Sequence, residues 1–405
     1  MKRQLLTLRL LLNLQAIFLV VLIVRCYFFL FPVKRRKTNS LLILESLPVE
    51  NAGYQYRAAK WKPYFEKANW QFEIWTIIED KASYDTLTSP ENISRYLVYS
   101  MWLRLRQILR SRHHARVIVR RELLQYNDYG NCFMEKLLQT IHPSVVLDID
   151  DNIAEAKREP RQITSWFGKI NREDGLKFTN SLLHYHSFIV GTPFLKEFVL
   201  SIRPSLAHPN FCFVPTCVDY DQYQAKEYNN FKTPVRIGWI GGIGNLPYLE
   251  IVVPALNLLA SRYPIELHVL SGQDFVSTQA VHFPIVNEKW TLASEIDTLK
   301  KWDIGLMPLP NSKLATGKSG FKLLQYMGLG LVAAASDVGI NNEIISDKEN
   351  AYLVKGQEDW YAVLLSIIEA HESWSSIGRN ARSTVDSTYT FTANAARYVD
   401  FIERL

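Results

Sequence analysis

The chain has 405 residues, of which 48% are hydrophobic, 12% aromatic and 21% charged. This composition supports well-packed cores and excludes an intrinsically disordered chain, a collagen-like repeat and a coiled coil. A chain longer than about 300 residues exceeds what one hydrophobic core usually serves, so we expect two domains. The four cysteines are too few and too irregularly spaced for a disulfide framework or a zinc site.

The net charge of +6 is concentrated at the N-terminus. Residues 1–37 contain eight Lys and Arg residues and no acid, because the first acidic residue is Glu45. Taking these eight from the 46 basic residues leaves 38 against 40 acidic ones, a charge of −2 for the rest of the chain. Nucleic-acid binding needs a basic surface, so we exclude nucleic acid as a partner.

The first element in chain order is an apolar run of 22 residues, Leu10–Phe31. A helix of this length covers the roughly 30 Å hydrocarbon core of a bilayer. The basic residues Lys34–Lys37 follow it where a signal peptide would have a small-residue cleavage site, so we predict an uncleaved membrane anchor with a basic flank over 1–37. A helix lying on the membrane surface is the alternative, because polar residues interrupt the run. The flanking charges weakly favour a membrane-associated protein with its catalytic part in the cytoplasm.

Apolar segments and helical segments then alternate along the chain. We predict strands within 40–48, 70–78, 115–123 and 144–151, at the start of the apolar segment 186–202 and within 211–219, and helices at 56–67, 94–112 and 131–141. Strands that are apolar nearly throughout, alternating with helices, are typical of a parallel sheet covered on both faces.

A polar stretch before residue 235 separates this half from a second series of the same kind. Here we predict strands within 235–242, 265–272, 302–310, 331–336 and 351–354, and helices at 248–262, 293–301, 318–328, 342–345, 360–370, 374–383 and 392–405. The predicted organisation is an N-terminal Rossmann-like domain (40–225), a hinge (226–234), a C-terminal Rossmann-like domain (235–390) and a C-terminal helix (391–405). Ligands of such sheets bind beyond the carboxyl ends of the strands, so we expect two α/β domains facing a cleft.

A glycine-rich loop, 241–245, lies between a predicted strand and a predicted helix. Glycine lets backbone N–H groups approach an oxyanion, and a helix N-terminus adds positive potential. The pattern therefore predicts a phosphate site, to which we assign Gly241, Gly242 and Asn245. A tight turn without a ligand is the alternative.

The same region does not carry the fingerprint of a dinucleotide cofactor. That fingerprint has a third glycine or an alanine where this chain has Pro247, and an acid at the end of the next strand, where this chain has Ser271 and Gly272. We therefore exclude a nicotinamide cofactor and place Ser271 in the candidate phosphate site.

Two lysines one helical turn apart are the more specific signal. Lys318 and Lys322 lie on one face of a predicted helix that glycines precede, beside unpaired backbone N–H groups. This pattern predicts a diphosphate site with Gly320 and Phe321, neutralised without a metal, and Gln325 offering its amide to sugar or ribose hydroxyls. Solvated surface charges are the alternative.

Three carboxylates, Asp148, Asp150 and Asp151, end one strand of the first half. Close carboxylates raise one another's pKa and suit acid–base chemistry or hydroxyl recognition, so we assign a catalytic role to Asp150 and Asp151. A helix cap is the alternative reading. No histidine or further carboxylate at ligand spacing accompanies them, and we expect no metal.

Taken together, these segments resemble the GT-B glycosyltransferases of family 4, which transfer sugars from nucleotide donors. The resemblance spans 40–405 and rests on VRIGWIGG, DIGLMPLP, GKSGFKLLQYMGLGLVAAASDVGINNEII and NAYLV in the family's order and spacing. The N-terminal half adds LLILESLP, VVLDIDD and FVPTCVDYDQY. The resemblance implies a retaining transfer, with the donor diphosphate held by the C-terminal domain and no metal or cofactor beyond the nucleotide-sugar substrate.

Three features of the chain depart from the family pattern. The family commonly has glutamates at both ends of an E-x7-E motif, where this chain has Gly317 and Gln325. Many members carry a basic residue in the first glycine loop, which this chain lacks, so we expect Lys318 and Lys322 to supply that charge. Many relatives end the strand matching VVLDIDD with a histidine, where this chain has Asp150.

The sequence thus predicts a membrane-tethered glycosyltransferase that acts on a nucleotide-sugar donor and a glycan or lipid-linked acceptor. Two alternatives stay open at this point. The missing glutamates favour a non-catalytic, glycosyltransferase-like scaffold or sugar-binding protein, and the same architecture also serves NDP-sugar epimerases.

Overall fold

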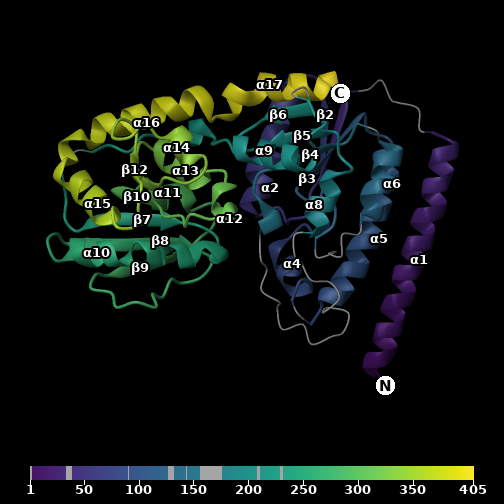
Figure 1. Ribbon diagram of the computed structural model, residues 1–405, viewed down its shortest axis with the longest axis horizontal. Helices are drawn as coiled ribbons and strands as arrows, with labels where there is room; N and C mark the ends of the chain where they lie inside the picture. Colours follow the sequence, from purple (N-terminus) through teal and green to yellow (C-terminus); the bar gives the residue numbers. More distant parts are fainter. Residues whose placement is uncertain are drawn as a thin grey trace. The chain divides into compact units, whose positions relative to one another are not determined.

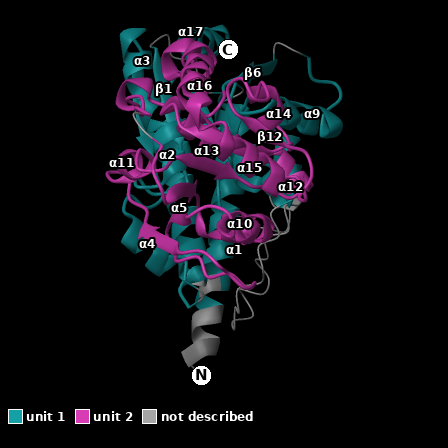
Figure 2. Cartoon of the chain, turned by 90° about the vertical axis from the view of Figure 1, so that its left-hand side faces the viewer, with its two compact units in different colours: residues 1–214, 395–405 teal, residues 215–394 magenta. Residues whose placement is uncertain are grey.

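The computed structural model describes residues 2–32, 39–89, 91–125, 132–142, 144–155, 176–207, 210–228 and 231–405. It divides the chain into two compact units, which Figure 2 colours separately. Unit 1 comprises Met1–Val214 and Ala395–Leu405, and unit 2 comprises Pro215–Asn394. Each unit is built on one six-stranded parallel sheet (Figure 1).

The sheet of unit 1 has the strand order β2-β1-β3-β4-β5-β6, with every neighbouring pair parallel. Its strands are β1 (Ser40–Leu44), β2 (Gln71–Trp75), β3 (Arg116–Arg120), β4 (Val146–Ile149), β5 (Ser187–Val190) and β6 (Phe211–Phe213). Every residue of β1, β4 and β5 is buried, as expected of strands covered by helices on both faces. The edge strand β2 is partly exposed.

The helices of unit 1 follow the strands that the sequence predicts. They are α1 (Lys2–Leu30), α2 (Ala52–Arg57), η1 (Ala59–Trp61), α3 (Lys62–Lys67), α4 (Lys81–Leu87), α5 (Ile93–Ser111), α6 (Phe133–Ile141), η2 (Ile153–Glu155), α8 (Leu176–Leu182), α9 (Pro193–Ile202) and, from Ala395 on, α17 (Phe391–Arg404). Side-chain caps fix several starts: Asp80 accepts from Ser83 N at 2.7 Å, and Thr192 accepts from Leu195 N at 3.2 Å.

The N-terminal helix α1 packs on α5 and α6 of unit 1 (Figure 1). Ile17, Val21 and Phe28 are buried in the same hydrophobic core as the strands, and Trp102 of α5 donates to the Asn13 side chain at 3.3 Å. Among the described residues, α1 is the one unbroken helix long and apolar enough to cross a membrane. The basic flank Lys34–Lys37 lies outside the described residues.

The sheet of unit 2 has the order β12-β11-β10-β7-β8-β9, again parallel throughout. Its strands are β7 (Val235–Ile240), β8 (Ile265–Ser271), β9 (Ile285–Lys289), β10 (Ile304–Met307), β11 (Val332–Ser336) and β12 (Tyr352–Val354). Five of these match predicted strands. Strand β9 was not predicted, because this edge strand is polar at its end and only partly buried.

The helices of unit 2 are η4 (Tyr220–Gln222), η5 (Ile243–Ile251), α10 (Val253–Ala260), α11 (Glu295–Leu299), α12 (Lys313–Thr316), α13 (Phe321–Gly328), α14 (Asn341–Ile344), α15 (Trp360–Glu369), η6 (His371–Ser373), α16 (Trp374–Thr388) and the start of α17. The single helix predicted at 248–262 is instead two, bent by 54°. Pro254 stands at the start of α10, and its ring excludes a continuous helix through the preceding turn.

The predicted fold class is therefore present, since each unit has the helix-covered parallel sheet of a Rossmann-like domain. The described residues of the predicted hinge include Lys226 and Tyr228, which bond to the side chain and the carbonyl of Asp303 in unit 2. A hinge function for 226–234 stays a prediction.

Candidate functional site

Strand β7 of unit 2 runs directly into the glycine-rich loop. Gly241 is packed so closely that a Cβ there would lie 2.6 Å from both Lys322 Nζ and the Trp239 ring. A Cβ at Gly242 or Gly244 would meet nothing within 4 Å. Glycine is thus required by packing at 241, whereas the backbone at 242 and 244 is open to an approaching ligand.

Hydrogen bonds hold this loop to the neighbouring strand. Ser271, buried at the end of β8, donates from Oγ to the Gly241 carbonyl at 2.8 Å, and Gly241 N donates to Leu270 O at 3.1 Å. Asn245 N donates to Gly242 O at 2.9 Å and closes the turn that begins η5. Ser271 therefore contacts the glycine-rich loop through this hydrogen bond and helps to hold the loop in place.

Both predicted lysines lie against this loop and the helix that follows it. Lys322 Nζ is 4.0 Å from the ring centroid of Trp239, the residue two before Gly241. Lys318 Nζ is 5.9 Å from the ring centroid of Tyr248 in η5. The lysine side chains are partly buried. The structure thus brings together two motifs that stand some 75 residues apart in the sequence.

Gly320 shapes the start of helix α13. Its φ of 70° lies in the left-handed region that favours glycine, and a Cβ would come within 2.9 Å of the Ile340 and Ile344 side chains. Phe321, partly buried, is the first residue of the helix. Lys318 lies just before this helix and not on it as predicted, and Lys322 lies in its first turn, so both ammonium groups are near the positive end of the helix dipole.

The side chain of Gln325 has partners inside unit 2, and its predicted contact with sugar or ribose hydroxyls stays a prediction. Its side chain is buried, and its amide nitrogen donates to Glu295 Oε1 at 2.6 Å and to Tyr223 Oη at 3.2 Å. Glu295 also accepts from Trp290 Nε1 at 2.6 Å. The amide nitrogen of Gln325 is thus engaged inside unit 2, and a buried carboxylate on α11, which the sequence did not single out, lies beside it.

The three aspartates of unit 1 lie at the carboxyl edge of its sheet, in a network with arginines that is buried at Asp148 and Asp150 and half-buried at Asp151 and Arg121. Asp150 accepts from Arg121 Nε at 2.6 Å and pairs with Arg120 at 3.1 Å. Asp151 pairs with Arg121 at 2.5 Å. The network also contains the pairs Arg57–Asp148 and Arg120–Glu45.

These arginines correct the expected electrostatics. Burial acts to raise the pKa of Asp150, but Arg121 and Arg120 outweigh it and hold this pKa well below the ordinary value of 3.8. Burial raises the pKa of Asp148 above its ordinary value, against the opposing charge of Arg57. The expectation that the carboxylates raise one another's pKa is therefore wrong for Asp150, which stays ionised at neutral pH.

No group of three His, Cys, Asp or Glu residues within the described ranges is arranged to hold a metal ion.

A scan against protein-family models gave no match, and neither did a search of curated proteins. The fold itself has many counterparts among solved structures. HepE from Anabaena, solved in complex with UDP-glucose, matches with a TM-score of 0.62 at 10% identity, over 90% of this chain and 100% of HepE. Sucrose-phosphate synthase from Thermosynechococcus elongatus matches with a TM-score of 0.62 at 12% identity, over 90% of this chain and 98% of the synthase.

TarM matches with a TM-score of 0.54 at 13% identity, over 76% of this chain, and the match spans 58% of the TarM chain. These similarities establish that the chain has the GT-B fold of two Rossmann-like domains. The proteins that share this fold include the galactosyltransferase WaaB and HepE, which was solved with UDP-glucose.

Proposed function

We propose that this protein is a glycosyltransferase that transfers a sugar from a nucleotide-sugar donor to a glycan or lipid-linked acceptor. The observation that carries the proposal is the position of Lys318 and Lys322 against the Gly241 loop, at the carboxyl edge of the unit 2 sheet. Ligands of parallel α/β sheets bind at this edge.

The chemistry of the site suits a departing nucleoside diphosphate. As the bond from the anomeric carbon to the diphosphate oxygen breaks, negative charge develops on that oxygen. The two ammonium groups and the first N–H groups of α13 stabilise this charge, and the open backbone at Gly242 and Gly244 lets the phosphates approach. A metal ion is not needed for this neutralisation.

Retention of the donor's anomeric configuration and membership of family 4 are the finer parts of the proposal. They are supported by the sequence motifs in the family's order. HepE was crystallised with UDP-glucose, so UDP is the first donor nucleotide to test. A place in polysaccharide biosynthesis follows from the glycan acceptor.

For unit 1 we propose a role on the acceptor side for Asp150 and Asp151. Asp150 is ionised and paired with two arginines. It is therefore suited to accepting hydrogen bonds and not to donating a proton. The buried amide of Gln325, where a glutamate is common, favours the non-catalytic scaffold as the second candidate.

The first test is calorimetric titration of UDP and UDP-sugars. Replacing both Lys318 and Lys322 by Ala removes two charge-assisted contacts to phosphate, each worth about 1.5–3 kcal/mol, so we expect UDP affinity to fall by at least about a hundredfold. The matched control replaces two exposed lysines of unit 2, Lys301 and Lys355, by Ala and should bind UDP as the wild type does.

The outcome separates the candidates. Unchanged UDP affinity in the Lys318→Ala/Lys322→Ala protein refutes the assigned site. Wild-type protein that binds no nucleoside diphosphate and releases no sugar from any common donor would favour the scaffold, and a donor isomer formed without acceptor would favour an epimerase.

A further inference from the structure

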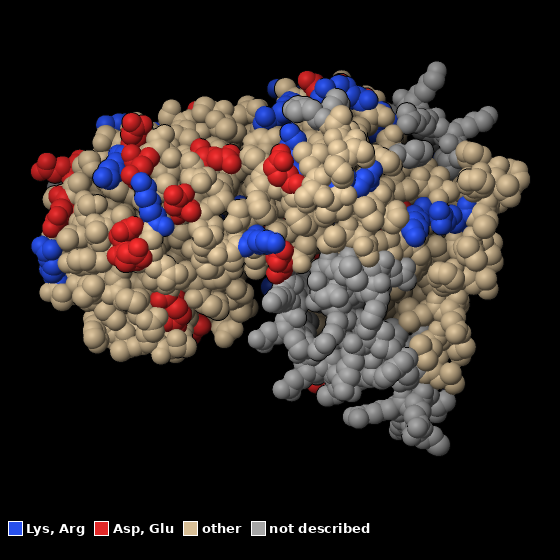
Figure 3. Space-filling view, viewed as in Figure 1, with Lys and Arg blue, Asp and Glu red and all other residues tan. Residues whose placement is uncertain are grey.

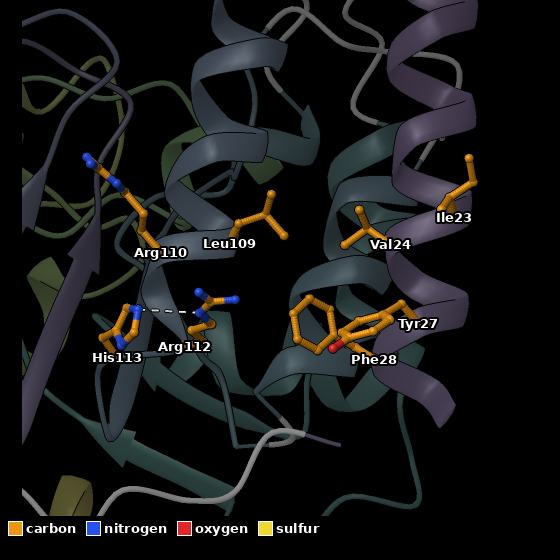
Figure 4. A pocket seen from close by; sticks show the side chains of 8 residues that line it. All are labelled: Ile23, Val24, Tyr27, Phe28, Leu109, Arg110, Arg112 and His113. Carbon is orange, nitrogen blue, oxygen red and sulfur yellow. Dashed lines mark hydrogen bonds between the residues drawn. The ribbon is translucent and has the colours of Figure 1, made fainter. Parts of the chain in front are cut away.

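A groove separates α1 from the end of α5 in unit 1. It is lined by apolar side chains of both helices, with basic side chains from the end of α5, and has a volume of about 420 Å³; its lining is Ile23, Val24, Tyr27, Phe28, Leu109, Arg110, Arg112 and His113. Such a volume lies within the range of about 300–1,000 Å³ typical of small-molecule sites. Figure 4 shows Val24, Phe28 and Leu109 pointing into the space between the helices.

The packing of α1 bears on how it meets a membrane. Its buried residues Ile17, Val21 and Phe28 attach it to α5 and α6 over about three turns. A helix that crossed the bilayer in this position would carry α5 with it, and α5 contains four arginines and no acid. Placing these arginines inside the bilayer is costly, so this arrangement favours α1 lying along the membrane surface.

The opposite face of α1 is apolar and exposed. Leu8, Leu12 and Leu19 are 54%, 56% and 56% exposed. At about 100° per residue these positions lie across the helix from the buried Ile17 and Val21. In the space-filling view the described surface on this side of unit 1 is tan apart from one blue patch of basic side chains (Figure 3). An apolar face of this kind is expected to enter the boundary between head groups and acyl chains.

Basic side chains adjoin the groove where α5 ends. Arg110, Arg112 and His113 are exposed, and Arg112 Nε donates to His113 Nε2 at 3.3 Å. Figure 4 shows Arg112 pointing into the space towards α1, whereas Arg110 points away from that helix. A guanidinium at the end of an apolar groove is complementary to a lipid phosphate attached to an acyl chain.

We propose that α1 docks unit 1 on the membrane surface and that the groove holds one acyl chain of an anionic phospholipid, with its phosphate at Arg112. This inference does not depend on the sugar-transfer proposal. In this proposal α1 lies in the membrane–water interface and does not span the bilayer. The lipid has a defined binding site in the groove.

Flotation of the full chain with vesicles tests the docking face. We expect binding to phosphatidylcholine vesicles that contain phosphatidylglycerol, and much weaker binding without it. Leu12→Glu/Leu19→Glu should abolish binding, and Leu258→Glu, at a leucine of unit 2 that is also 56% exposed, should bind normally. Arg112→Gln should weaken binding about fivefold, the value of about one basic residue at an anionic surface, whereas Arg379→Gln in unit 2 should not.

A photoactivatable phosphatidylglycerol with a diazirine in its acyl chain tests the groove itself. We expect adducts within 23–28 and 109–113, and their loss in Leu109→Trp, which fills the groove, while vesicle binding persists. Adducts confined to the outer face of α1 would overturn the groove. Resistance of the protein to alkaline carbonate extraction from membranes would overturn the surface orientation, because it indicates a spanning helix.

Discussion

Gly241 matters both for the packing of unit 2 and for the proposed donor site. Its hydrogen atom lies where any side chain would contact both the Trp239 ring and Lys322 Nζ at 2.6 Å. The cation therefore sits over the indole ring because residue 241 has no Cβ. Sequence reasoning selected this glycine for its backbone freedom, but the structure gives it a second role, to admit the lysine.

We predict that Gly241→Ala displaces Lys322 and lowers both stability and donor affinity. Overpacking of this kind costs about 1–3 kcal/mol. Thermal unfolding and calorimetry with UDP measure the two effects. Gly242→Ala is the control for stability, since a Cβ there meets nothing within 4 Å. Wild-type stability and UDP affinity in Gly241→Ala would contradict the packing described.

Asp150 illustrates why residue chemistry could not be predicted from the sequence. Acids stand close to it in the chain, at 148 and 151, which led to the expectation of a raised pKa. Its neighbours in space are Arg120 and Arg121, at the end of the adjacent strand β3. The local sequence pattern does not show which strands pair. The direction of the pKa shift of Asp150 therefore could not be predicted, because it depends on the pairing of β3 with β4.

We predict that Asp150→Asn destabilises the protein by about 1.5–3 kcal/mol at pH 7, because buried Arg120 then keeps only Glu45, and half-buried Arg121 only Asp151, as a charged partner. The folded pKa of Asp150 lies below its ordinary value of 3.8, so its ionised form contributes stability above that pH. The wild-type advantage should therefore hold from pH 7 to about 4 and decline at lower pH.

Urea unfolding at pH 7, 5 and 3 checks this prediction. Asp85→Asn is the control, because Asp85 forms an exposed pair with Lys81 and such pairs contribute at most about 1 kcal/mol. An Asp150→Asn protein as stable as Asp85→Asn would show that the arginine network is not closed as described.

At the scale of elements, the alternation of apolar strands and helices was sufficient to predict eleven of the twelve strands that the structure describes. The pattern holds because strands covered on both faces are apolar throughout. It fails where a strand lies at an edge, as in β9, and where a proline divides one helical pattern into η5 and α10.

The residues of the candidate site that could be predicted are those at the ends of predicted strands and helices. Residues that end or begin an element, such as Gly241, Ser271 and Gly320, are placed by the topology at one edge of the sheet. Gln325 lies one turn into α13, and its orientation depends on Glu295 and Tyr223, which come from other elements. Contacts of that kind have no signature at the level of the sequence.

At the scale of the whole molecule, the stability of unit 1 depends on α1, whereas we expect donor binding by unit 2 not to depend on it. The helix contributes Ile17, Val21 and Phe28 to the core of unit 1, and the candidate donor site lies within unit 2. Burying three large apolar side chains is worth about 1.5–3 kcal/mol each, as an upper estimate. Loss of α1 should therefore weaken unit 1 and leave donor binding intact.

We predict that removing residues 1–38 lowers the unfolding temperature of unit 1 while UDP still binds to unit 2. Differential scanning calorimetry with and without UDP measures both, because a ligand of the native state raises the transition of the unit that binds it. The full chain carrying Leu12→Glu/Leu19→Glu is the control, since it changes the exposed face of α1 and keeps its packing. That protein should unfold as the wild type does. Equal stability of the shortened chain would show that α1 does not pack on α5 and α6, and loss of the UDP shift would show that the donor site depends on more than unit 2.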